Sequence, residues 1–285
     1  SHLAVRIAQL YGTSVVNADS RQVYQELSIG TAKPTLAEQC GVPHYLFGHV
    51  SIFSPYNAAQ YEKDALATLS DLFTQRRIVV VVGGTGLYIK ALCEGLDDMP
   101  PAFPDIRDAL QALWQTEGLA PLQAELQATD PVYFGQVDRQ NPHRLIRALE
   151  VVRGTGQPFS SFRIGKQAVR PFRMLKIGLN QERALLHERI NQRVDQMMTD
   201  GLLAEAQALY PYKELPALQT VGYQEIFEYL SGDISLPQAV EHIKTNTRQY
   251  AKRQLTWFRK DQSMQWLAPG DWISAKKLID QQFRR

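Results

Sequence analysis

Residues 15–24 read VVNADSRQVY, and this stretch decides the fold. The apolar run Ser14–Ala18 predicts a strand without a solvent-facing side, as found in parallel sheets. Asp19 then lies at the carboxyl end of that strand, where open α/β sheets bind their ligands. A second apolar run, Ile78–Val82, predicts another strand and passes directly into Gly83–Tyr88, GGTGLY. Two strands are therefore expected to deliver polar groups to one crevice, which indicates a catalytic site.

Helical patterns alternate with these strands. Residues His2–Leu10 and Leu87–Cys93 each predict a helix. A longer helix is predicted over Tyr61–Arg76, with an inner stripe formed by Tyr61, Ala65, Leu69, Leu72 and Phe73. Alternation of this kind predicts an α/β fold with a parallel sheet flanked by helices.

The middle of the chain has a different pattern. Residues 106–156 show helical periodicity and no convincing strand, with prolines before them and glycines after. We therefore predict an α/β core over residues 1–105 and 172–285, and an all-helical insertion over residues 106–171. The sheet is expected to resume at Met174–Leu179. Further helices are predicted over 181–209, 236–258 and about 275–285.

Composition excludes several classes of protein. The chain has 285 residues, 44% of them hydrophobic, with a net charge of +2 that is too small to indicate a nucleic-acid partner. No apolar run reaches the ~18 residues that a membrane span needs. Cys40 and Cys93 form no metal-binding spacing, and no signal-peptide pattern is present. We expect a cytoplasmic protein without a structural disulfide.

Asp19 has two interpretations. A turn aspartate is the commonest role for this residue after a strand. However, Ser20, Arg21 and Gln22 follow it directly, and a simple turn does not satisfy all these side chains. A carboxylate at a strand end is a plausible general base when it faces a substrate proton.

The glycine cluster Gly83–Gly86 also has two interpretations. Glycines let backbone N–H groups approach an anion at a helix N-terminus, and Thr85 adds a hydroxyl donor. The alternative is a plain strand-to-helix turn. The position of the cluster after a buried strand favours a phosphate site.

Arg193 borders the apolar line of a predicted helix, formed by Leu186, Ile190, Val194 and Met197. Its stem would then cover the core while its head reaches water. Alternatively, the guanidinium points into the crevice and holds a phosphate, for which its fork geometry is well suited. The other anion-binding features favour the second interpretation.

Basic side chains gather in two places. Residues 244–260 contain six basic residues and no acidic one, and Arg248, Lys252 and Arg259 fall on one side of a helix. A solvated helix face normally mixes both signs, so this helix indicates contact with a nucleic-acid backbone. A second cluster spans His143–Arg147. The loop Thr220–Gln224 presents Tyr223, which either stacks on an unpaired base or belongs to the core.

These segments, in this order, resemble the tRNA dimethylallyltransferase family, also called the tRNA isopentenyltransferases, in its bacterial form. The resemblance spans nearly the whole chain and is specific as a set. The matching segments are Ala18–Tyr24, Ile29–Pro34, Val42–His44, Gly83–Tyr88, Arg144 with Arg147–Glu150, Val221–Tyr223 and Lys252–Phe258.

The resemblance implies a P-loop NTPase-like α/β core with a helical insertion. It implies transfer of a dimethylallyl group from dimethylallyl diphosphate to N6 of adenosine 37, beside the anticodon of tRNA, with Mg2+. Asp19 matches the general base, Thr85 and Arg193 match residues near the diphosphate, and Ser20, Arg21 and Gln22 match the segment that holds the target base. Regions that match tRNA contacts contain Asp19, Thr85, Arg107, His143, Arg144, Leu145, Ile146, Arg147, Gln219, Thr220, Val221, Gly222, Tyr223, Gln224, Lys252, Arg253, Gln254, Trp257 and Arg259.

The sequence departs from the family at its first residue. The family carries a Gly-x-x-x-x-Gly-Lys-Ser/Thr loop before the first helix, and Ser1 aligns with the last position of that motif. We expect that the strand and loop before Ser1 are omitted or truncated, and we assign Ser1 to the diphosphate and to Mg2+. The Cys/His set of the zinc finger in some eukaryotic relatives is not found, which favours a bacterial-type enzyme. A monomer is expected.

Two other functions fit parts of the pattern. A P-loop kinase acting on a small metabolite shares the sheet and phosphate site, but leaves the basic helix unexplained. An RNA-binding module without activity would make Asp19, Thr85 and Arg193 structural. Binding of a tRNA anticodon stem-loop distinguishes the transferase from the kinase, and turnover distinguishes it from the module.

Overall fold

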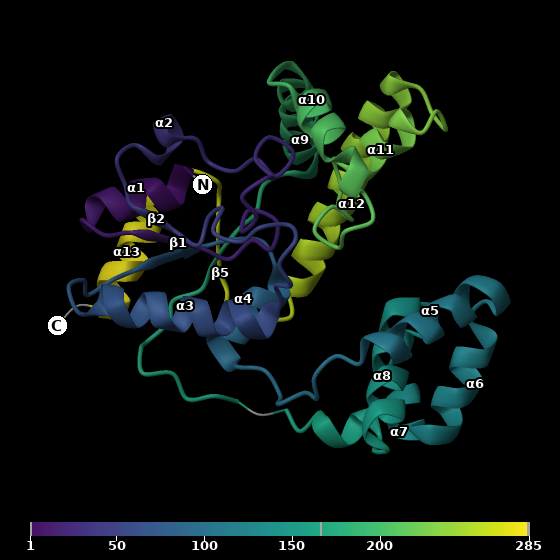
Figure 1. The fold of residues 1–285 in the computed structure, drawn as a ribbon. Coiled ribbons are helices and arrows are strands. Elements are labelled where there is room, and N and C mark those ends of the chain that lie inside the picture. The colour runs from purple at the N-terminus through teal and green to yellow at the C-terminus, as the bar shows by residue number, and fades with distance from the viewer. Residues whose placement is uncertain (1, 166, 284–285) are drawn as a thin grey trace. The chain divides into compact units, whose positions relative to one another are not determined.

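The computed structural model describes residues 2–165 and 167–283. The chain divides into two compact units, one formed by Ser1–Cys93 with Arg170–Arg285 and the other by Glu94–Val169. The first unit holds the strands, and the second is helical (Figure 1).

The sheet of the first unit has β1, Val15–Asn17, at its centre. The strands β2, His44–Tyr45, and β3, Val80–Val82, both pair with β1 in parallel. All residues of β1 are buried, as the continuous apolar pattern predicted. Because Asn17 pairs with Val82, β1 and β3 end side by side. The parallel sheet flanked by helices is confirmed.

Helices cover this sheet. Helix α1, His2–Leu10, packs against α13, Trp272–Phe283, through Ile7 and Ile279. Helix α2 is short and spans Leu36–Gln39. Helix α3, Ala58–Phe73, buries Ala58, Tyr61, Ala65 and Leu69, and helix α4, Gly86–Glu94, follows β3.

The predicted inner stripe of α3 is wrong at Phe73. This side chain is 37% exposed because it ends the helix, where its ring packs on Phe172. The predicted helix over 61–76 thus begins at Ala58, with Asn57 as its N-cap, and ends at Phe73.

A second pair of strands lies after the insertion. Strand β4, Ile177–Leu179, pairs in parallel with β5, Gln265–Leu267. The expectation that the first sheet resumes at residue 174 is therefore wrong, since β4 pairs with β5 instead of β1 or β3. The sequence conceals β5 because two of its three residues are exposed.

Helix α12, Leu236–Phe258, belongs to a group of four helices. It begins at a Ser235–Gln238 capping box. The others are α9, Arg183–Thr199, α10, Leu202–Leu209, and α11, Gln224–Leu230 (Figure 1). The single helix predicted over 181–209 is broken at Gly201, whose φ of 106° lies in the left-handed region that favours glycine. A 3-10 turn, η2, spans Tyr210–Tyr212.

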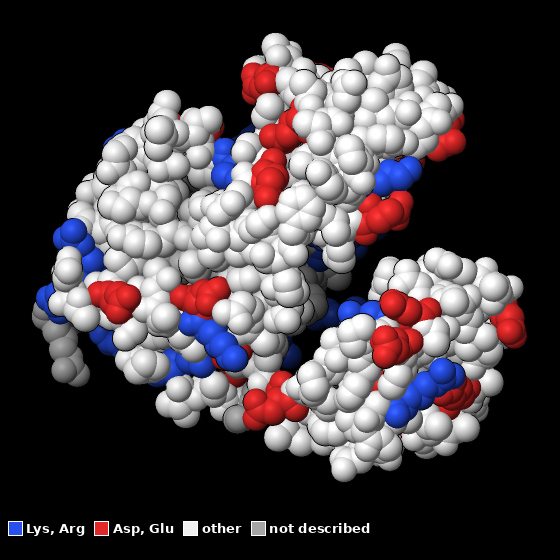
Figure 2. Space-filling view, in the orientation of Figure 1, with Lys and Arg blue, Asp and Glu red and all other residues white. Residues whose placement is uncertain are grey.

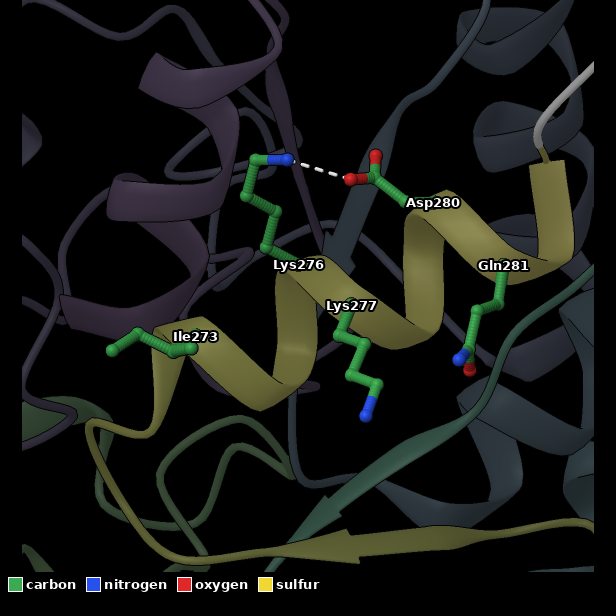
Figure 3. Close-up of a pocket in the computed structure, with 5 residues that line it drawn as sticks. All are labelled: Ile273, Lys276, Lys277, Asp280 and Gln281. Carbon is green, nitrogen blue, oxygen red and sulfur yellow. Dashed lines mark hydrogen bonds and ion pairs between the residues drawn. The ribbon is translucent and has the colours of Figure 1, made fainter.

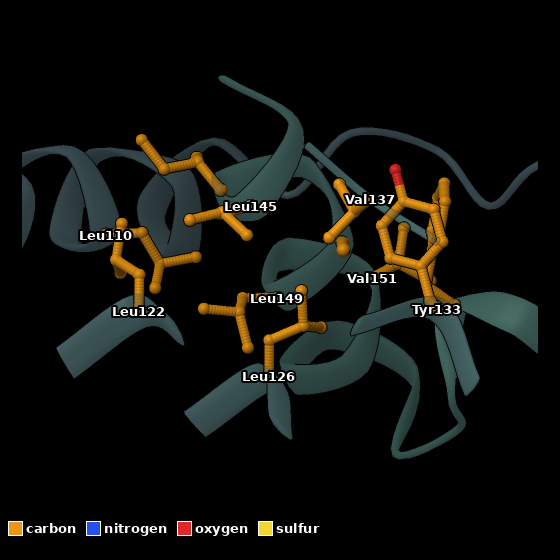
Figure 4. Close-up of a cluster of buried hydrophobic side chains, with 11 residues drawn as sticks. Leu110, Leu122, Leu126, Tyr133, Val137, Leu145, Leu149 and Val151 are labelled. Atoms are coloured by element: carbon orange, nitrogen blue, oxygen red, sulfur yellow. The ribbon is translucent and has the colours of Figure 1, made fainter. Parts of the chain in front are cut away.

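The second unit contains α5, α6, α7 and α8, followed by a 3-10 turn. Their hydrophobic cluster is drawn in Figure 4, where Leu110 of α5, Leu126 of α6 and Leu149 of α8 point toward one another. The bounds are Pro104–Glu117 for α5, Ala120–Thr129 for α6, Pro131–Phe134 for α7, Pro142–Thr155 for α8 and Phe159–Phe162 for the turn η1.

A buried carboxylate organises this second unit. The Glu150 side chain is fully buried, accepts a hydrogen bond from Phe103 N at 2.7 Å, and pairs with Arg107 at 2.8 Å and Arg147 at 3.0 Å. These bonds tie residue 103 to α8, so residues 94–105 lie in the helical unit, although the sequence placed them in the core. Burial alone raises the pKa of Glu150, but the hydrogen bonds from Phe103, Arg107 and Arg147 outweigh it and lower the pKa.

We expect Glu150→Gln to destabilise the helical unit by ~2–3 kcal/mol. This is less than the cost of breaking a fully buried ion pair, because both arginine side chains are partly exposed. The stabilisation should be present above the ordinary glutamate pKa of about 4.3 and lost as pH falls through the lowered folded-state pKa. Hydrogen exchange of peptides within 94–165 measures it. Glu125→Gln, which breaks only the more exposed pair with Arg153, should cost at most ~1 kcal/mol. Equal protection in both variants would contradict the role of Glu150.

Candidate active site

Asp19 forms a tight turn directly after β1. The Asn17 side chain brackets the Asp19 backbone, since Asn17 Nδ2 donates to Asp19 O at 3.0 Å and Asn17 Oδ1 accepts from Asp19 N at 2.9 Å. Asp19 Oδ1 accepts from Arg21 N at 2.8 Å and Gln22 N at 3.3 Å. The role of a turn aspartate therefore accounts for Oδ1, one of the two carboxylate oxygens. Among the described residues, Oδ2 has no hydrogen-bond partner, and it is available to accept a substrate proton.

Thr85 connects the ends of β1 and β3. Its Oγ1 accepts from Ser20 N at 2.9 Å and donates to Ser20 Oγ at 3.2 Å, while Thr85 N donates to Ala18 O at 3.3 Å. A Cβ on Gly83 would strike the Ala18 backbone, so only glycine permits this close approach. Asp19, Ser20 and Thr85 thus lie in one cluster, as expected from two parallel strands that end together.

The glycines Gly84 and Gly86 lie against side chains of α12. A Cβ on Gly84 would strike the Gln254 amide, and a Cβ on Gly86 would strike the Trp257 indole. Gln254 Nε2 also donates to Gly84 O at 2.9 Å. The space that a side chain at either position would need is thus occupied by α12 side chains, and the predicted contact of this loop with a phosphate stays a prediction. These two glycines let the C-terminal half of α12 approach the site.

Two tyrosines at this site were missed in the sequence. Tyr88 is 5% exposed, and its ring stacks on Tyr61 with centroids 4.1 Å apart. Burial, and the charge of Asp19 among its neighbours, raise the pKa of Tyr88. Burial and Asp19 also raise the pKa of Tyr250, while hydrogen bonding with Thr85 and Gln254 opposes the rise. The available signals were the position of Tyr88 in the first turn after Gly-Gly-Thr-Gly, and the spacing of Tyr250 four residues before Gln254.

Arg193 is exposed on α9, beside the buried Ile190 and Val194. Among the described residues it forms no hydrogen bond or ion pair, and it does not contact Asp19 or Thr85 in this way. Desolvation and the neighbouring charge of Arg189 lower the pKa of Arg193, and Glu38 opposes that effect. A guanidinium that has no carboxylate partner and lies close to a second cation favours the binding of an anionic ligand.

Arg21 and Gln22 hold neighbouring loops. Arg21 Nη1 donates to Pro216 O at 3.0 Å and Ala217 O at 3.1 Å. Gln22 Nε2 donates to Thr31 O at 2.9 Å and to the carbonyl of the next residue at 3.0 Å. Their side chains fix the loops around the Asp19 turn in this structure, and their predicted contact with the target base stays a prediction.

The base-stacking interpretation of Tyr223 is wrong for this structure. Tyr223 is fully buried, and its hydroxyl donates to Glu205 at 2.6 Å. Gly222 is buried too, whereas Gln219 and Gln224 are exposed and bond to each other at 2.7 Å. The most exposed side chains of the 219–224 loop are therefore the two glutamines at its ends.

The predicted tRNA contacts also divide into side chains that the protein itself engages and side chains that are exposed. Leu145 and Ile146 are core residues, which excludes their side chains from an RNA surface. Arg107 and Arg147 are engaged by Glu150. Apart from Arg107, the predicted contacts that are exposed are His143, Arg144, Gln219, Gln224, Lys252, Arg253, Trp257 and Arg259. Figure 2 shows both signs of charge interspersed over the visible face of each unit, so the basic positions form no large single-sign area there.

A metal ion has few protein ligands here. The described residues contain no group of three or more His, Cys, Asp or Glu side chains able to hold one, and Ser1 lies outside them. Mg2+ is commonly held by one or two carboxylates together with substrate phosphates. Most ligands to the ion would therefore come from the substrate phosphates.

Two hollows in the surface of the described residues are not lined by Asp19. One is lined by α13 side chains on the outside of that helix, with Lys276 paired to Asp280 at 2.6 Å (Figure 3). It contains no group of the Asp19–Thr85 cluster. No helix in the part of the chain that the structure describes is long and apolar enough to cross a membrane.

The fold and the cluster define a class: an α/β protein with polar side chains gathered at the carboxyl ends of parallel strands. A profile of the IPP transferase family matches residues 22–261. The chain therefore belongs to the IPP transferase family and is a prenyltransferase.

Relatives support this membership. The chain is 47% identical to tRNA dimethylallyltransferase 2 of Parabacteroides distasonis, over 95% of this chain and 91% of that protein. It is 46% identical to tRNA dimethylallyltransferase 1 of Bacteroides fragilis, over 94% and 89%.

Solved structures agree. The full-length tRNA isopentenylpyrophosphate transferase of Bacillus halodurans matches with a TM-score of 0.71 and 33% identity, covering 98% of this chain and 91% of that one. A eukaryotic dimethylallyltransferase acting on tRNA matches with a TM-score of 0.79 and 27% identity, covering 97% and 74%. The α/β fold with a helical insertion is thus shared with tRNA-modifying prenyltransferases.

Proposed function

We propose that this protein transfers a dimethylallyl group from dimethylallyl diphosphate to N6 of adenosine 37 in the anticodon stem-loop of tRNA, in the cytoplasm and as a monomer. The observation that carries the proposal is the Asp19–Ser20–Thr85 cluster at the joined ends of β1 and β3, in a chain of the IPP transferase family. The product is N6-(dimethylallyl)adenosine.

Asp19 is the proposed general base. The N6 amine attacks C1 of the dimethylallyl group, the C1–O bond breaks, and diphosphate leaves with the bonding electron pair. The N6 proton passes to Asp19 Oδ2, while Oδ1 stays bonded to Arg21 N and Gln22 N. These backbone bonds hold the carboxylate in one orientation, which lowers the cost of aligning it in the transition state. Because an anticodon-loop base is normally stacked, adenosine 37 must be withdrawn from its stack to reach this carboxylate.

The departing diphosphate requires positive charge. Arg193 has an uncommitted guanidinium, and Thr85 contributes a hydroxyl at the end of β3. Interactions that strengthen as the leaving group gains charge stabilise the transition state more than the ground state. Mg2+, when bound with the diphosphate, would supply further charge neutralisation, and Ser1 is proposed as its protein contact.

The basic side chains of α12 are proposed to contact the tRNA backbone. Lys252, Arg253 and Arg259 are exposed on this helix, whereas Arg248 is held by Asn191 at 2.8 Å. Gln254 and Trp257 join the same helix to Gly84 and Gly86, so α12 extends from the reactive cluster to these cations. His143 and Arg144 are proposed as a second contact, in the helical unit.

We expect Lys252→Ala and Arg259→Ala each to weaken tRNA binding and to reduce the slope of log K against log salt by about 1, because each removes one phosphate contact. Fluorescence anisotropy with labelled tRNA over a salt series gives the slope. Lys277→Ala, on the exposed side of α13, is the matched control and should leave the slope unchanged. An unchanged slope in both α12 variants would exclude this helix as the contact.

Turnover with labelled substrates tests the proposed function. The protein is incubated with tRNA, Mg2+ and dimethylallyl diphosphate labelled in the prenyl group, and in parallel with ATP labelled in the γ-phosphate. Label from the prenyl donor should enter the tRNA. Transfer from ATP to a small acceptor, without prenyl transfer, would favour a kinase, and tRNA binding without either transfer would favour a binding module.

A further inference from the structure

The carboxylate of Glu205 on α10 fills a cradle of three successive backbone amides. Its Oε2 accepts from Ser28 N at 3.1 Å and Ile29 N at 2.9 Å. Its Oε1 accepts from Gly30 N at 3.0 Å and from the Tyr223 hydroxyl at 2.6 Å. Successive N–H groups that converge in this way form an anion-binding concavity. Glu205 is thus an anion that the protein supplies to its own loop.

The residues around this cradle fit it closely. A Cβ on Gly30 would lie 2.6 Å from the Tyr223 ring, so the loop can approach that ring only with glycine here. Tyr223 is fully buried, and burial together with the Glu205 charge raises its pKa. The Tyr223 hydroxyl therefore stays protonated and donates to the carboxylate. Of the two roles that the sequence left open for Tyr223, base stacking or the core, this contact with Glu205 accounts for the second.

The cradle connects α10 and α11 to the Asp19 turn. The loop that begins at Ser28 continues to Thr31, whose carbonyl accepts from Gln22 Nε2 at 2.9 Å. The Gln22 backbone N–H donates to Asp19 Oδ1 at 3.3 Å. A second connection runs from Arg21 to the carbonyls of residues 216 and 217, in the segment between α10 and α11. The turn that carries the proposed base is therefore fastened to these helices at two points.

We propose that Glu205 is a positioning residue for prenyl transfer, which orients the Asp19 turn through the 28–30 amide cradle and Gln22. This role rests on the proposed function, since the orientation matters for the reaction that Asp19 is proposed to assist. Both carboxylate oxygens are committed to the 28–30 amides and the Tyr223 hydroxyl, so the proposed effect reaches the reaction through the loop. Misplacement of a catalytic group by about 1 Å can cost ~10²-fold in rate.

The cradle can be tested without any activity. Glu205→Ala removes the carboxylate and leaves three amides that formate can occupy. We expect formate to raise the Tm of this variant in a saturable manner, with no such rise in wild type. Asp261→Asn is the matched control, because Asp261 also accepts from a backbone N–H, a hydroxyl and a lysine, but does not contact the 28–30 loop. A formate effect of equal size in all three proteins would overturn the cradle.

Kinetics then test the positioning role. Glu205→Ala should lower kcat by ~10²-fold with KM values for both substrates near wild type, and formate should restore kcat. Tyr223→Phe, which removes one donor, should lower kcat less, and this variant decides the matter if Glu205→Ala does not fold. Wild-type kcat in both variants, or a formate-restored Tm without restored kcat, would overturn the inference. Absence of transfer by wild type would contradict the proposed function alone, since the formate experiment still judges the cradle.

Discussion

Replacing Asp19 with asparagine should lower the rate of dimethylallyl transfer by ~10²–10⁴-fold, the range expected when a general base is removed. The substitution is nearly isosteric, and the amide oxygen can still accept from Arg21 N and Gln22 N, so the turn should keep its shape. The dissociation constant for tRNA should remain near the wild-type value. Single-turnover transfer and anisotropy, measured on the same preparation, separate the two quantities.

The control for this variant is Asp261→Asn, which removes a carboxylate remote from the Asp19 turn and should keep the wild-type transfer rate. A strong loss of tRNA affinity with normal turnover in Asp19→Asn would reject the assignment of Asp19 as base. It would leave Asp19 as the turn aspartate that its Oδ1 bonds already describe.

Replacing Arg193 with alanine should lower kcat/KM for dimethylallyl diphosphate by ~10²–10³-fold, because a preorganised charge opposite the leaving group is lost. The kcat/KM of Arg193→Lys should fall between those of wild type and Arg193→Ala, since lysine keeps the charge but not the fork of donors. Steady-state kinetics with the diphosphate varied at saturating tRNA provide the measurement.

Arg189→Ala is the matched control on the same helix. Arg189 carries the same charge, but it is bonded to Gln181 at 2.8 Å. The Arg189→Ala substitution should lower kcat/KM far less than Arg193→Ala does. Equal losses would indicate a general effect of charge on α9, and unchanged kinetics in Arg193→Ala would return this residue to the role of a side chain whose stem covers Ile190 and Val194.

Local patterns predicted α1 and α12 well, whereas they shifted the bounds of α3 and missed the break at Gly201. Helix α12 begins and ends where its sequence predicts, because Ser235 and Gln238 form a capping box and apolar residues repeat at helical spacing. Helix α1 also follows its pattern. That β1 and β3 end side by side could also be predicted, because both strands were visible as continuous apolar runs, the pattern typical of a parallel sheet.

Other features depended on partners far away in the sequence. Strand β5 is short and mostly exposed, so nothing local marked it as the partner of β4. Tyr223 lacked a signal that separates a core ring from a stacking ring, because its partner Glu205 lies on another helix. Glu150 likewise engages Arg107 and Arg147 in ion pairs, although both arginine side chains stay partly exposed. The family resemblance supplied the roles of Asp19, Thr85 and Arg193, and these roles stay predictions.

The position of the transferred group tests the central claim most directly. Two anticodon stem-loops that differ only in adenosine or guanosine at position 37 are incubated with the protein, Mg2+ and labelled dimethylallyl diphosphate, and the nucleosides are identified by mass spectrometry. The account predicts N6-(dimethylallyl)adenosine from the first stem-loop and no labelled product from the second. Equal labelling of both, or no labelling of the adenosine form while it is bound, would contradict it.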